Sequence, residues 1–293
     1  MTNSPLISVL TPSYNQAQFL AVTLESVARQ SYPVWEHIIM DGGSQDSSVE
    51  IIQNHAARYP KKVHWVSEPD HGQADAVNKA FSYSKGEIIG WLNSDDGYFT
   101  RTTLEEVAAA FAAHPEVDVL YGDAVLIDVH NRLLRILPQP AYRAAGMLRA
   151  CRISQPAAFF RRRVMETHRL DADISIVMDY EYWLRLGQAG TRFKHLPRLW
   201  AVDRNHPARK IIAQRDQLAA QRTAVQRKYG RADSGIVRWV EKLTLGLPLR
   251  LAGVRSLLDV YHLSPDNLAV PLVLDPLPAT LWRQLVKRNR DLV

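Results

Sequence analysis

The sequence predicts an α/β fold in which a mostly parallel sheet is flanked by helices. Over the first hundred residues, short apolar runs rich in β-branched residues alternate with amphipathic stretches, which is typical of parallel strands joined by helices. The 293 residues are 46% hydrophobic and 23% charged, so one large or two small domains can bury a real core. This composition excludes disordered, collagen-like and mucin-like proteins, and the single cysteine, Cys151, excludes a disulfide framework and a Cys-rich zinc site.

The first elements follow one another regularly. Strands are expected at 6–10, 35–40, 63–67 and 87–92, and helices at 19–30, 49–59 and 73–84. Three of these strands end in polar turn sequences, at 11–15, 41–44 and 93–96. Because ligands of parallel sheets bind beyond the carboxyl ends of the strands, these turns predict a binding site.

The rest of the chain is less regular. We expect a helix at 102–114, strands at 117–121, 124–129 and 156–160, an arginine-rich turn at 161–163, and a helix at 180–188 with Asp179 just before it. Further helical regions are expected at 215–229, 236–263 and 281–290.

Charge is distributed unevenly along the chain. Residues 1–135 carry 9 Lys and Arg against 17 Asp and Glu, a net charge of −8, and residues 136–293 carry 27 against 13, a net charge of +14. Such asymmetry often marks an anionic partner. The start of the sequence has no basic leader segment and no run approaches a membrane span, so we expect a cytoplasmic protein.

The tetrapeptide Asn93-Ser94-Asp95-Asp96 carries the sharpest chemical signal. Paired carboxylates after a buried strand suit Mg²⁺ or Mn²⁺, which prefer oxygen ligands and retain phosphate oxygens. The alternative is an Asp-rich turn. The segment 41–44 also follows a strand, and a carboxylate at Asp41 can accept from a base N–H or a ribose hydroxyl, although a plain turn explains it as well.

Two later clusters can take part in group transfer. Asp179 and Glu181 lie two residues apart at a helix start among aromatic residues, where desolvation can raise the pKa of a general base; the alternative is an acid that serves the helix dipole. The basic residues Arg204, His206 and Lys210 can clamp a diphosphate, or form a solvated loop. No Gly-x-Ser-x-Gly elbow and no Walker loop is present.

Taken in order, these segments resemble the family 2 glycosyltransferases, which have the GT-A fold and use nucleotide-activated sugars. The resemblance covers roughly residues 5–212 and rests on ISVLTPSYN (7–15), DGGSQD (41–46), EPDHGQADAVNKA (68–80), GWLNSDD (90–96), QPA (155–157) and MDYEYWLRL (178–186). It implies a GT-A, Rossmann-like domain at 1–212, with a nucleotide-binding half (1–100) and an acceptor half (101–212). A helical, basic C-terminal extension follows at 213–293.

The resemblance also implies roles for individual residues. Nucleotide-sugar contacts are implied for Pro12, Ser13, Tyr14, Asp41, Gln73, Asp75, Asn93, Ser94 and Asp95, with Asp41 bonding the base. Positions 93–96 resemble the family's DxD motif with Asn93 in place of its first Asp, which leaves Asp95 as the metal ligand and Asp96 in support. Mg²⁺ or Mn²⁺ is the implied cofactor.

The implied reaction is an inverting sugar transfer to an acceptor hydroxyl. Asp179 matches the family's catalytic base, although Met178 replaces the acid that usually precedes it. The charge of the leaving group is met by the metal and by Arg204, His206 and Lys210. The implied donor is a nucleotide-diphospho-sugar, with a UDP-sugar favoured, and the implied acceptor a glycan or lipid-linked glycan in polysaccharide or glycolipid assembly.

A basic amphipathic segment at 238–258 can lie on an anionic membrane, which predicts peripheral association with the inner face of the plasma membrane; the alternative is packing on the sheet or on a second subunit. Nucleic acid is not an expected partner. Two other functions stay open, namely a catalytically inactive binding protein of the same fold and a nucleotidyltransferase, which would need a glycine-rich basic loop that residues 11–16 lack.

Overall fold

The apolar runs of the first hundred residues form four parallel strands. They are β1 (Ile7–Ser13), β2 (Trp35–Asp41), β3 (Val63–Ser67) and β4 (Ile88–Trp91). β1 pairs with β2 from Ile7↔Trp35 to Ser13↔Asp41, so the two polar turns that follow these strands begin side by side. The computed structural model describes residues 4–230.

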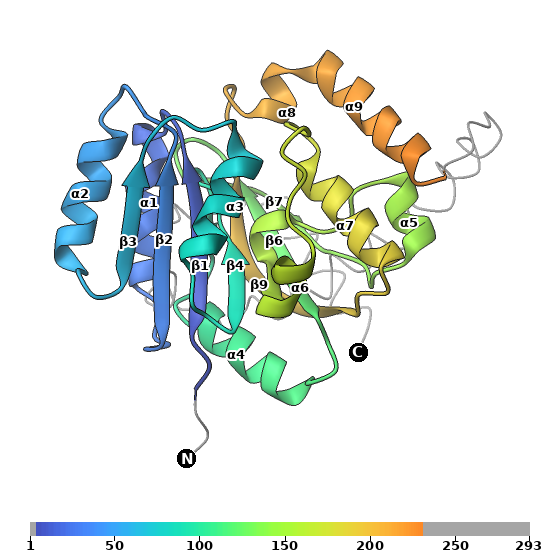
Figure 1. Cartoon of the computed structure of the whole chain (residues 1–293), viewed down its shortest axis with the longest axis horizontal. Coiled ribbons are helices and arrows are strands. Elements are labelled where there is room, and N and C mark those ends of the chain that lie inside the picture. The colour runs from blue at the N-terminus through green and yellow to red at the C-terminus, as the bar shows by residue number, and fades with distance from the viewer. Residues whose placement is uncertain (1–3, 231–293) are drawn as a thin grey trace, which may run out of the picture.

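Further strands extend this sheet. They are β5 (Gly97–Tyr98), β6 (Val119–Ile127), β7 (Leu133–Leu137), β8 (Ala158–Arg161) and β9 (Phe193–Arg204). Within residues 4–230 the nine strands have the order β3-β2-β1-β4-β8-β6-β9-β5, with β7 paired to β6. β8 runs antiparallel to β4 and to β6, and β9 runs parallel to β6. The carboxyl ends of β1, β2, β4 and β9 therefore lie on the same edge of the sheet, as Figure 1 shows.

Helices cover both faces of the sheet. The first four are α1 (Ala17–Ala28), α2 (Ser48–Arg58), α3 (Gln73–Tyr83) and α4 (Thr103–Ala113). The later ones are α5 (Ala144–Arg149), η1 (Gln155–Ala157), α6 (Arg162–Thr167), α7 (Met178–Gln188), α8 (Lys210–Ala213) and α9 (Arg215–Lys228). α3, α6 and α7 pack on one face and α1 and α4 on the other, so each face has its own apolar core.

This architecture confirms the predicted α/β class, with three local differences. The strands expected at 117–121 and 124–129 form one strand, β6, in which buried Asp123 lies at a shift of register against β9. The turn expected at 161–163 is the start of α6, and Arg161 bonds the carbonyl oxygens of Phe111, His114 and Val117. Asp179 lies inside the first turn of α7 rather than before it.

The basic helix expected at 215–229 is confirmed as α9. Val225 and Tyr229 pack into the same core as Trp183 of α7, which ties this helix to the sheet domain. The expected helices at 236–263 and 281–290, and the proposed membrane segment at 238–258, lie outside the described residues.

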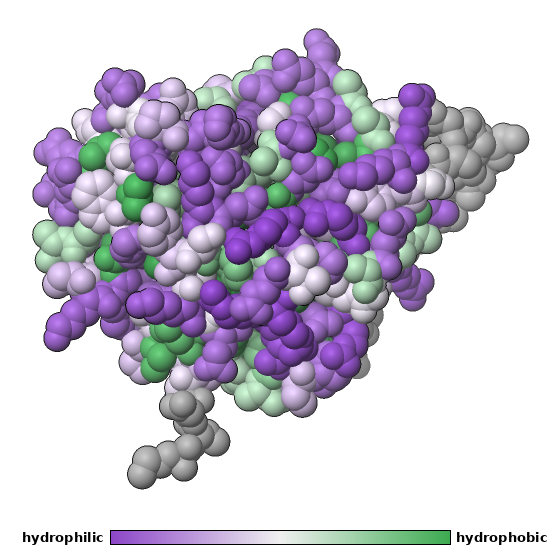
Figure 2. Space-filling view, viewed as in Figure 1, coloured by the Kyte–Doolittle hydropathy of each residue, from purple (hydrophilic) through white to green (hydrophobic). Residues whose placement is uncertain are grey.

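The face seen in Figure 2 is largely hydrophilic, with apolar side chains in small separate groups. Scattered apolar residues of this kind are normal on a protein surface. Across residues 4–230, no helix combines the length and the apolar character that crossing a membrane requires.

Candidate active site

A cavity of about 800 Å³ opens at the carboxyl edge of the sheet. Its walls come from the loops after β1 to β4, from η1 and the start of α7, and from the loop after β9. Predicted site residues that line it are Pro12, Ser13, Tyr14, Gln73, Asn93, Ser94, Asp95, Asp96, Asp179, His206 and Lys210. Segments far apart in the sequence thus meet in one place, as the sheet topology requires.

The loop after β1 gives the cavity an accessible, polar wall. Ser13 is almost fully buried, yet its hydroxyl oxygen has no hydrogen-bond partner. Tyr14 is 59% exposed at the rim. The Ser13 hydroxyl is therefore a buried polar group without a hydrogen-bond partner among the described residues, on a residue that lines the cavity.

Asp41, for which a contact with the base is expected, is not among the residues that line this cavity. Its carboxylate accepts four hydrogen bonds, from the backbone N–H groups of Gly43 and Ser44 and from the hydroxyls of Ser44 and Ser67. Asp41 is 2% exposed and shapes the turn from behind, while Gly42 faces the cavity. A side chain on Gly42 would meet the carboxylate of Asp70, 2.8 Å from its Cβ position.

Asp75 also serves the backbone rather than the cavity. Its carboxylate accepts from the His71 N–H at 3.0 Å and pairs with Lys79, four residues later on α3, at 3.3 Å. The hydrogen bond from His71 is the main cause that lowers the pKa of Asp75. The expected nucleotide contact at Asp75 stays a prediction.

The turn after β4 places its two acids differently. Asp95 lines the cavity, and its Oδ2 lies 2.9 Å from Nε2 of His206. Asp96 is 4% exposed and takes the Arg204 N–H on Oδ1. Burial raises the pKa of Asp96 well above its usual range, and the carboxylates of Asp95 and Asp203 raise it further.

The arginine that ends β9, Arg204, and the arginine in the loop after it, Arg209, have different contacts. The guanidinium of Arg204 bonds the carbonyl oxygens of Asp95 and Asp128 and the side chain of Asn131, and Arg204 is not among the cavity residues. Arg204 thus holds the Asp95 loop, and its expected contact with a diphosphate stays a prediction. Arg209 takes its place in the cavity wall, paired with Asp203 at 2.6 Å.

Lys210 lines the cavity next to Gln73, the first residue of α3. Its ammonium group donates to Gln73 Oε1 at 3.1 Å and to the Ser175 carbonyl at 3.3 Å. Burial lowers the pKa of Lys210, and the nearby carboxylates of Asp70 and Asp95 oppose that shift. A half-buried cation in a cavity wall is suited to an anionic ligand.

Asp179 has the environment of a general base. It lies in the first turn of α7 and lines the cavity, and one carboxylate oxygen accepts the N–H of Tyr180 at 2.7 Å. Burial raises the pKa of Asp179 to about 6. A base works best when its pKa lies near the operating pH, and this carboxyl is tuned toward that range.

The donor set fits a divalent metal with few protein ligands. Asp95 and His206 offer an oxygen and a nitrogen 2.9 Å apart in the cavity wall. Within residues 4–230 there is no group of three or more His, Cys, Asp and Glu side chains that would hold an ion alone. Mg²⁺ usually binds one or two carboxylates together with water and substrate phosphates, so this sparse set agrees with a metal that arrives with a phosphate ligand.

Sequence reasoning missed several cavity residues. They are Gln16, Asp70, Asp203 and Arg209, and it assigned no role to Gln155. Gln155 did stand in a segment that resembled the family, and Arg209 adjoins a cluster already singled out. The sequence therefore offered a signal for Gln155 and for Arg209. Nothing in it shows that Asp203, at the end of β9, faces Asp95.

Comparison with known proteins identifies the family. The model of the family described as glycosyl transferase family 2 matches residues 8–169, more than half of the chain. This protein belongs to glycosyl transferase family 2. The family assignment made from the sequence motifs is thereby confirmed.

Individual relatives agree with this assignment. A "PGL/p-HBAD biosynthesis glycosyltransferase" of Mycobacterium bovis is 29% identical over 164 residues, which cover 56% of this chain and 62% of the relative. An uncharacterized glycosyltransferase of Rickettsia felis is 26% identical over 196 residues, 62% of this chain and 31% of the relative. The chain thus spans less than two thirds of the length of either relative.

Solved structures confirm the GT-A fold. A mannosyltransferase from Pyrobaculum calidifontis, in complex with GDP-Man and Mn²⁺, superposes with a TM-score of 0.61 at 20% identity, covering 98% of this chain and 81% of that one. S. aureus TarS 1-349 in complex with UDP gives a TM-score of 0.57 at 18% identity, covering 86% and 79%. At such identities the likeness is one of fold.

Proposed function

We propose that this protein transfers a hexosyl group from a nucleotide-diphospho-sugar to an acceptor hydroxyl, with inversion at the anomeric carbon. The observation that carries the proposal is the meeting of Asp95 and Asp179 in one cavity of a family 2 fold, because the first suits a metal–diphosphate and the second a general base. Structural neighbours in complex with UDP and with GDP-Man support a nucleotide-linked donor.

The donor would lie along the wall built by the first hundred residues. The Ser13 hydroxyl and Gly42 face the end of the cavity near β1 and β2, where a nucleoside fits. Asp95 and His206 would hold Mg²⁺ or Mn²⁺, which offsets the negative charge of a diphosphate when bound. Lys210 and Arg209 add positive charge to the same part of the cavity.

Asp179 would act on the acceptor. Its ionised carboxylate takes the proton of the acceptor hydroxyl while that oxygen attacks the anomeric carbon on the face opposite the departing diphosphate. One direct displacement inverts the configuration. A glycan or lipid-linked glycan acceptor, in polysaccharide or glycolipid assembly, is part of the proposal.

A panel of nucleotide sugars tests the donor assignment. Thermal unfolding is measured with UDP-, GDP- and dTDP-sugars in Mn²⁺ and in EDTA, and nucleotide release is then measured with any sugar that stabilises the protein. We expect stabilisation and slow hydrolysis with Mn²⁺ only, and loss of both in Asp95→Ala but not in Glu50→Ala, an exposed acid on α2. If no nucleotide sugar binds or turns over with any divalent metal, the protein is an inactive relative of the family.

A further inference from the structure

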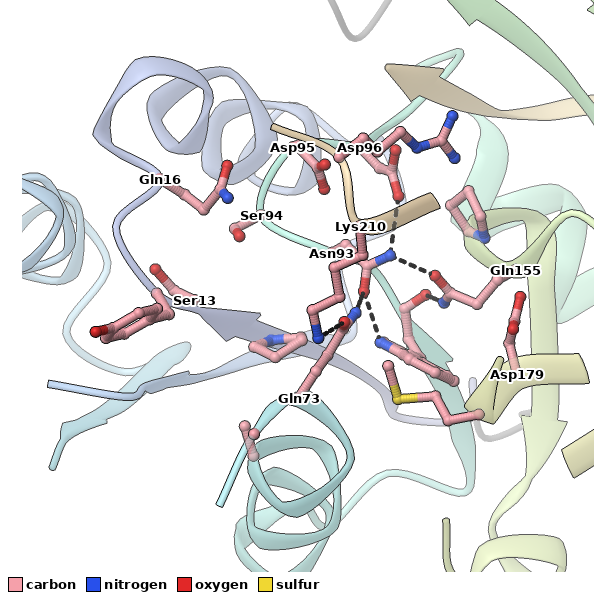
Figure 3. A pocket seen from close by; sticks show the side chains of 18 of the residues that line it. Ser13, Gln16, Gln73, Asn93, Ser94, Asp95, Asp96, Gln155, Asp179 and Lys210 are labelled. Carbon is pink, nitrogen blue, oxygen red and sulfur yellow. Dashed lines mark hydrogen bonds between the residues drawn. The ribbon is translucent and has the colours of Figure 1, made fainter. Parts of the chain in front are cut away.

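The side-chain amide of Asn93 uses its full hydrogen-bonding capacity. Its oxygen accepts from Gln73 Nε2 at 2.6 Å and from Trp91 Nε1 at 2.9 Å. Its nitrogen donates to Gln155 Oε1 at 2.8 Å and to Asp96 Oδ2 at 3.2 Å. An asparagine side chain has two donor hydrogens and two acceptor lone pairs, so every one of them is in use (Figure 3).

This amide lies at the centre of a longer chain of contacts across the cavity floor. On one side, Gln73 Oε1 accepts from Lys210. On the other side of Asn93, Asp96 directly follows Asp95, the proposed metal ligand. Gln155, which also bonds Asn93, donates through Nε2 to the Trp91 carbonyl. The chain joins the cation that follows β9 to the carboxylates that follow β4 (Figure 3).

The neighbours of Asn93 fix which groups it must present. The indole N–H of Trp91 can only donate. Gln155 turns its oxygen to Asn93 because its nitrogen is committed to the Trp91 carbonyl, and Gln73 turns its nitrogen there because its oxygen receives Lys210. Position 93 must therefore accept twice and donate at least once to Gln155, and an ionised carboxylate has no proton to donate.

The carboxylates around Asn93 also favour an amide at this position. The amide nitrogen of Asn93 lies 3.2 Å from an oxygen of Asp96, and Asp95 and Asp203 add two carboxylates to this wall. An aspartate at position 93 would bring a fourth carboxylate against Asp96 in a largely buried place. An acid at position 93 would also remove the N–H that Asp96 Oδ2 accepts from Asn93.

We propose that Asn93 is a positioning residue that couples Lys210 to the carboxylate wall, and that an amide, rather than the acid of the family's DxD motif, is required there. The proposal rests on the function proposed above. It predicts that Asn93→Asp, which creates a two-acid motif, damages the enzyme rather than supplying a second metal ligand.

Steady-state kinetics show whether Asn93→Asp damages the enzyme or supplies a second metal ligand. With the nucleotide sugar found in the panel, we expect kcat/KM to fall at least tenfold, with no decrease in the Mn²⁺ concentration needed for half-maximal rate. Asn78→Asp is the matched control, because its amide is likewise held through both its oxygen and its nitrogen, here by the backbone of Leu170, but lies outside the cavity wall. It should leave kcat and KM unchanged. A rise in kcat/KM in Asn93→Asp, or tighter Mn²⁺ binding, overturns the proposal.

Thermal unfolding in EDTA, without donor, provides a test that does not depend on turnover. Asn93→Asp should lower Tm by several degrees, and the double variant Asn93→Asp/Asp96→Asn should recover most of this loss because an amide again faces a carboxylate. A Tm of the single variant equal to that of the wild type, or no recovery in the double variant, contradicts the proposal. If the wild type binds no nucleotide sugar, the proposed function fails while this unfolding test still stands.

Discussion

Asp41 and Asp75 differ from Asp179, at the start of α7, in the hydrogen-bond donors that reach their carboxylates. Asp41 accepts from backbone N–H groups and from the hydroxyls of Ser44 and Ser67, Asp75 accepts the His71 N–H and pairs with Lys79, and neither lines the cavity. Asp179 lines the cavity, its carboxylate accepts backbone N–H groups, and burial raises its pKa to about 6. A carboxylate whose oxygens are already supplied with donors holds the backbone, and one short of donors is available for chemistry.

The same contrast occurs within one turn of helix. Glu181 lies two residues after Asp179 and is fully buried, yet it receives Arg185, Lys228 and the hydroxyl of Tyr229. These donors lower the pKa of Glu181 against the opposing effect of its burial. Burial alone therefore does not set the direction of the pKa shift of a carboxyl group, because the donors that reach it also count.

The largest expected effect is that of removing the base. Asp179→Asn keeps the size of the side chain but cannot take a proton, so we expect transfer to an acceptor to fall about 10²–10⁴-fold. The measurement is the rate of glycoside formation at saturating donor. Asp173→Asn, an exposed acid in the preceding loop, should retain the wild-type rate. Activity close to wild type in Asp179→Asn would place the base elsewhere.

The pH dependence of transfer should report the same carboxyl. Because the pKa of Asp179 is raised to about 6 and the base acts when ionised, kcat should be constant at pH 7–8 and fall as pH decreases through 6. Well below the pKa the loss approaches roughly tenfold per pH unit. A rate that is level down to pH 4.5 would mean that no acid with a raised pKa takes part.

A smaller effect is expected from a change of Glu181, whose carboxylate receives Arg185, Lys228 and the hydroxyl of Tyr229. Glu181→Gln weakens the contacts of a buried charge, and we expect the free energy of unfolding to fall by about 1–3 kcal/mol. Glu166→Gln is the matched control because it breaks a similar Glu–Arg pair four residues apart whose side chains are solvent-exposed, and such pairs contribute about 0–1 kcal/mol. Urea denaturation of both variants measures the difference. Equal losses would contradict the distinction drawn between the two pairs.

The fold was largely predictable because its strands are short apolar runs that end in polar turns. The parallel order of β1 to β4 then brings residues 11–16, 41–44 and 93–96 to one edge whatever the side chains do. β6 was harder to predict, since Gly122 and Asp123 resemble a break, while the structure pairs Asp123 with His195 and the N–H of Gln139.

Individual site residues were less predictable than the site as a whole. A motif shows that an acid follows a strand, but not which donors reach its oxygens, and so Asp41 and Asp75 were assigned to the ligand. Arg204 and Arg209 belong to one basic segment, and only tertiary contacts show that the first bonds carbonyl oxygens while the second faces the cavity. Asp95 and Asp179, predicted as a metal ligand and a general base, both line the cavity, and their roles stay predictions.

The central claim is that one cavity combines a donor-binding wall with a separate base. Calorimetric titration of a nucleotide-diphospho-sugar, in Mn²⁺, into the wild type, Asp95→Ala and Asp179→Asn tests it most directly. We predict that Asp179→Asn binds the donor with wild-type affinity and that Asp95→Ala binds it at least tenfold more weakly. Unchanged affinity in Asp95→Ala, or an equal loss in both variants, would contradict this division.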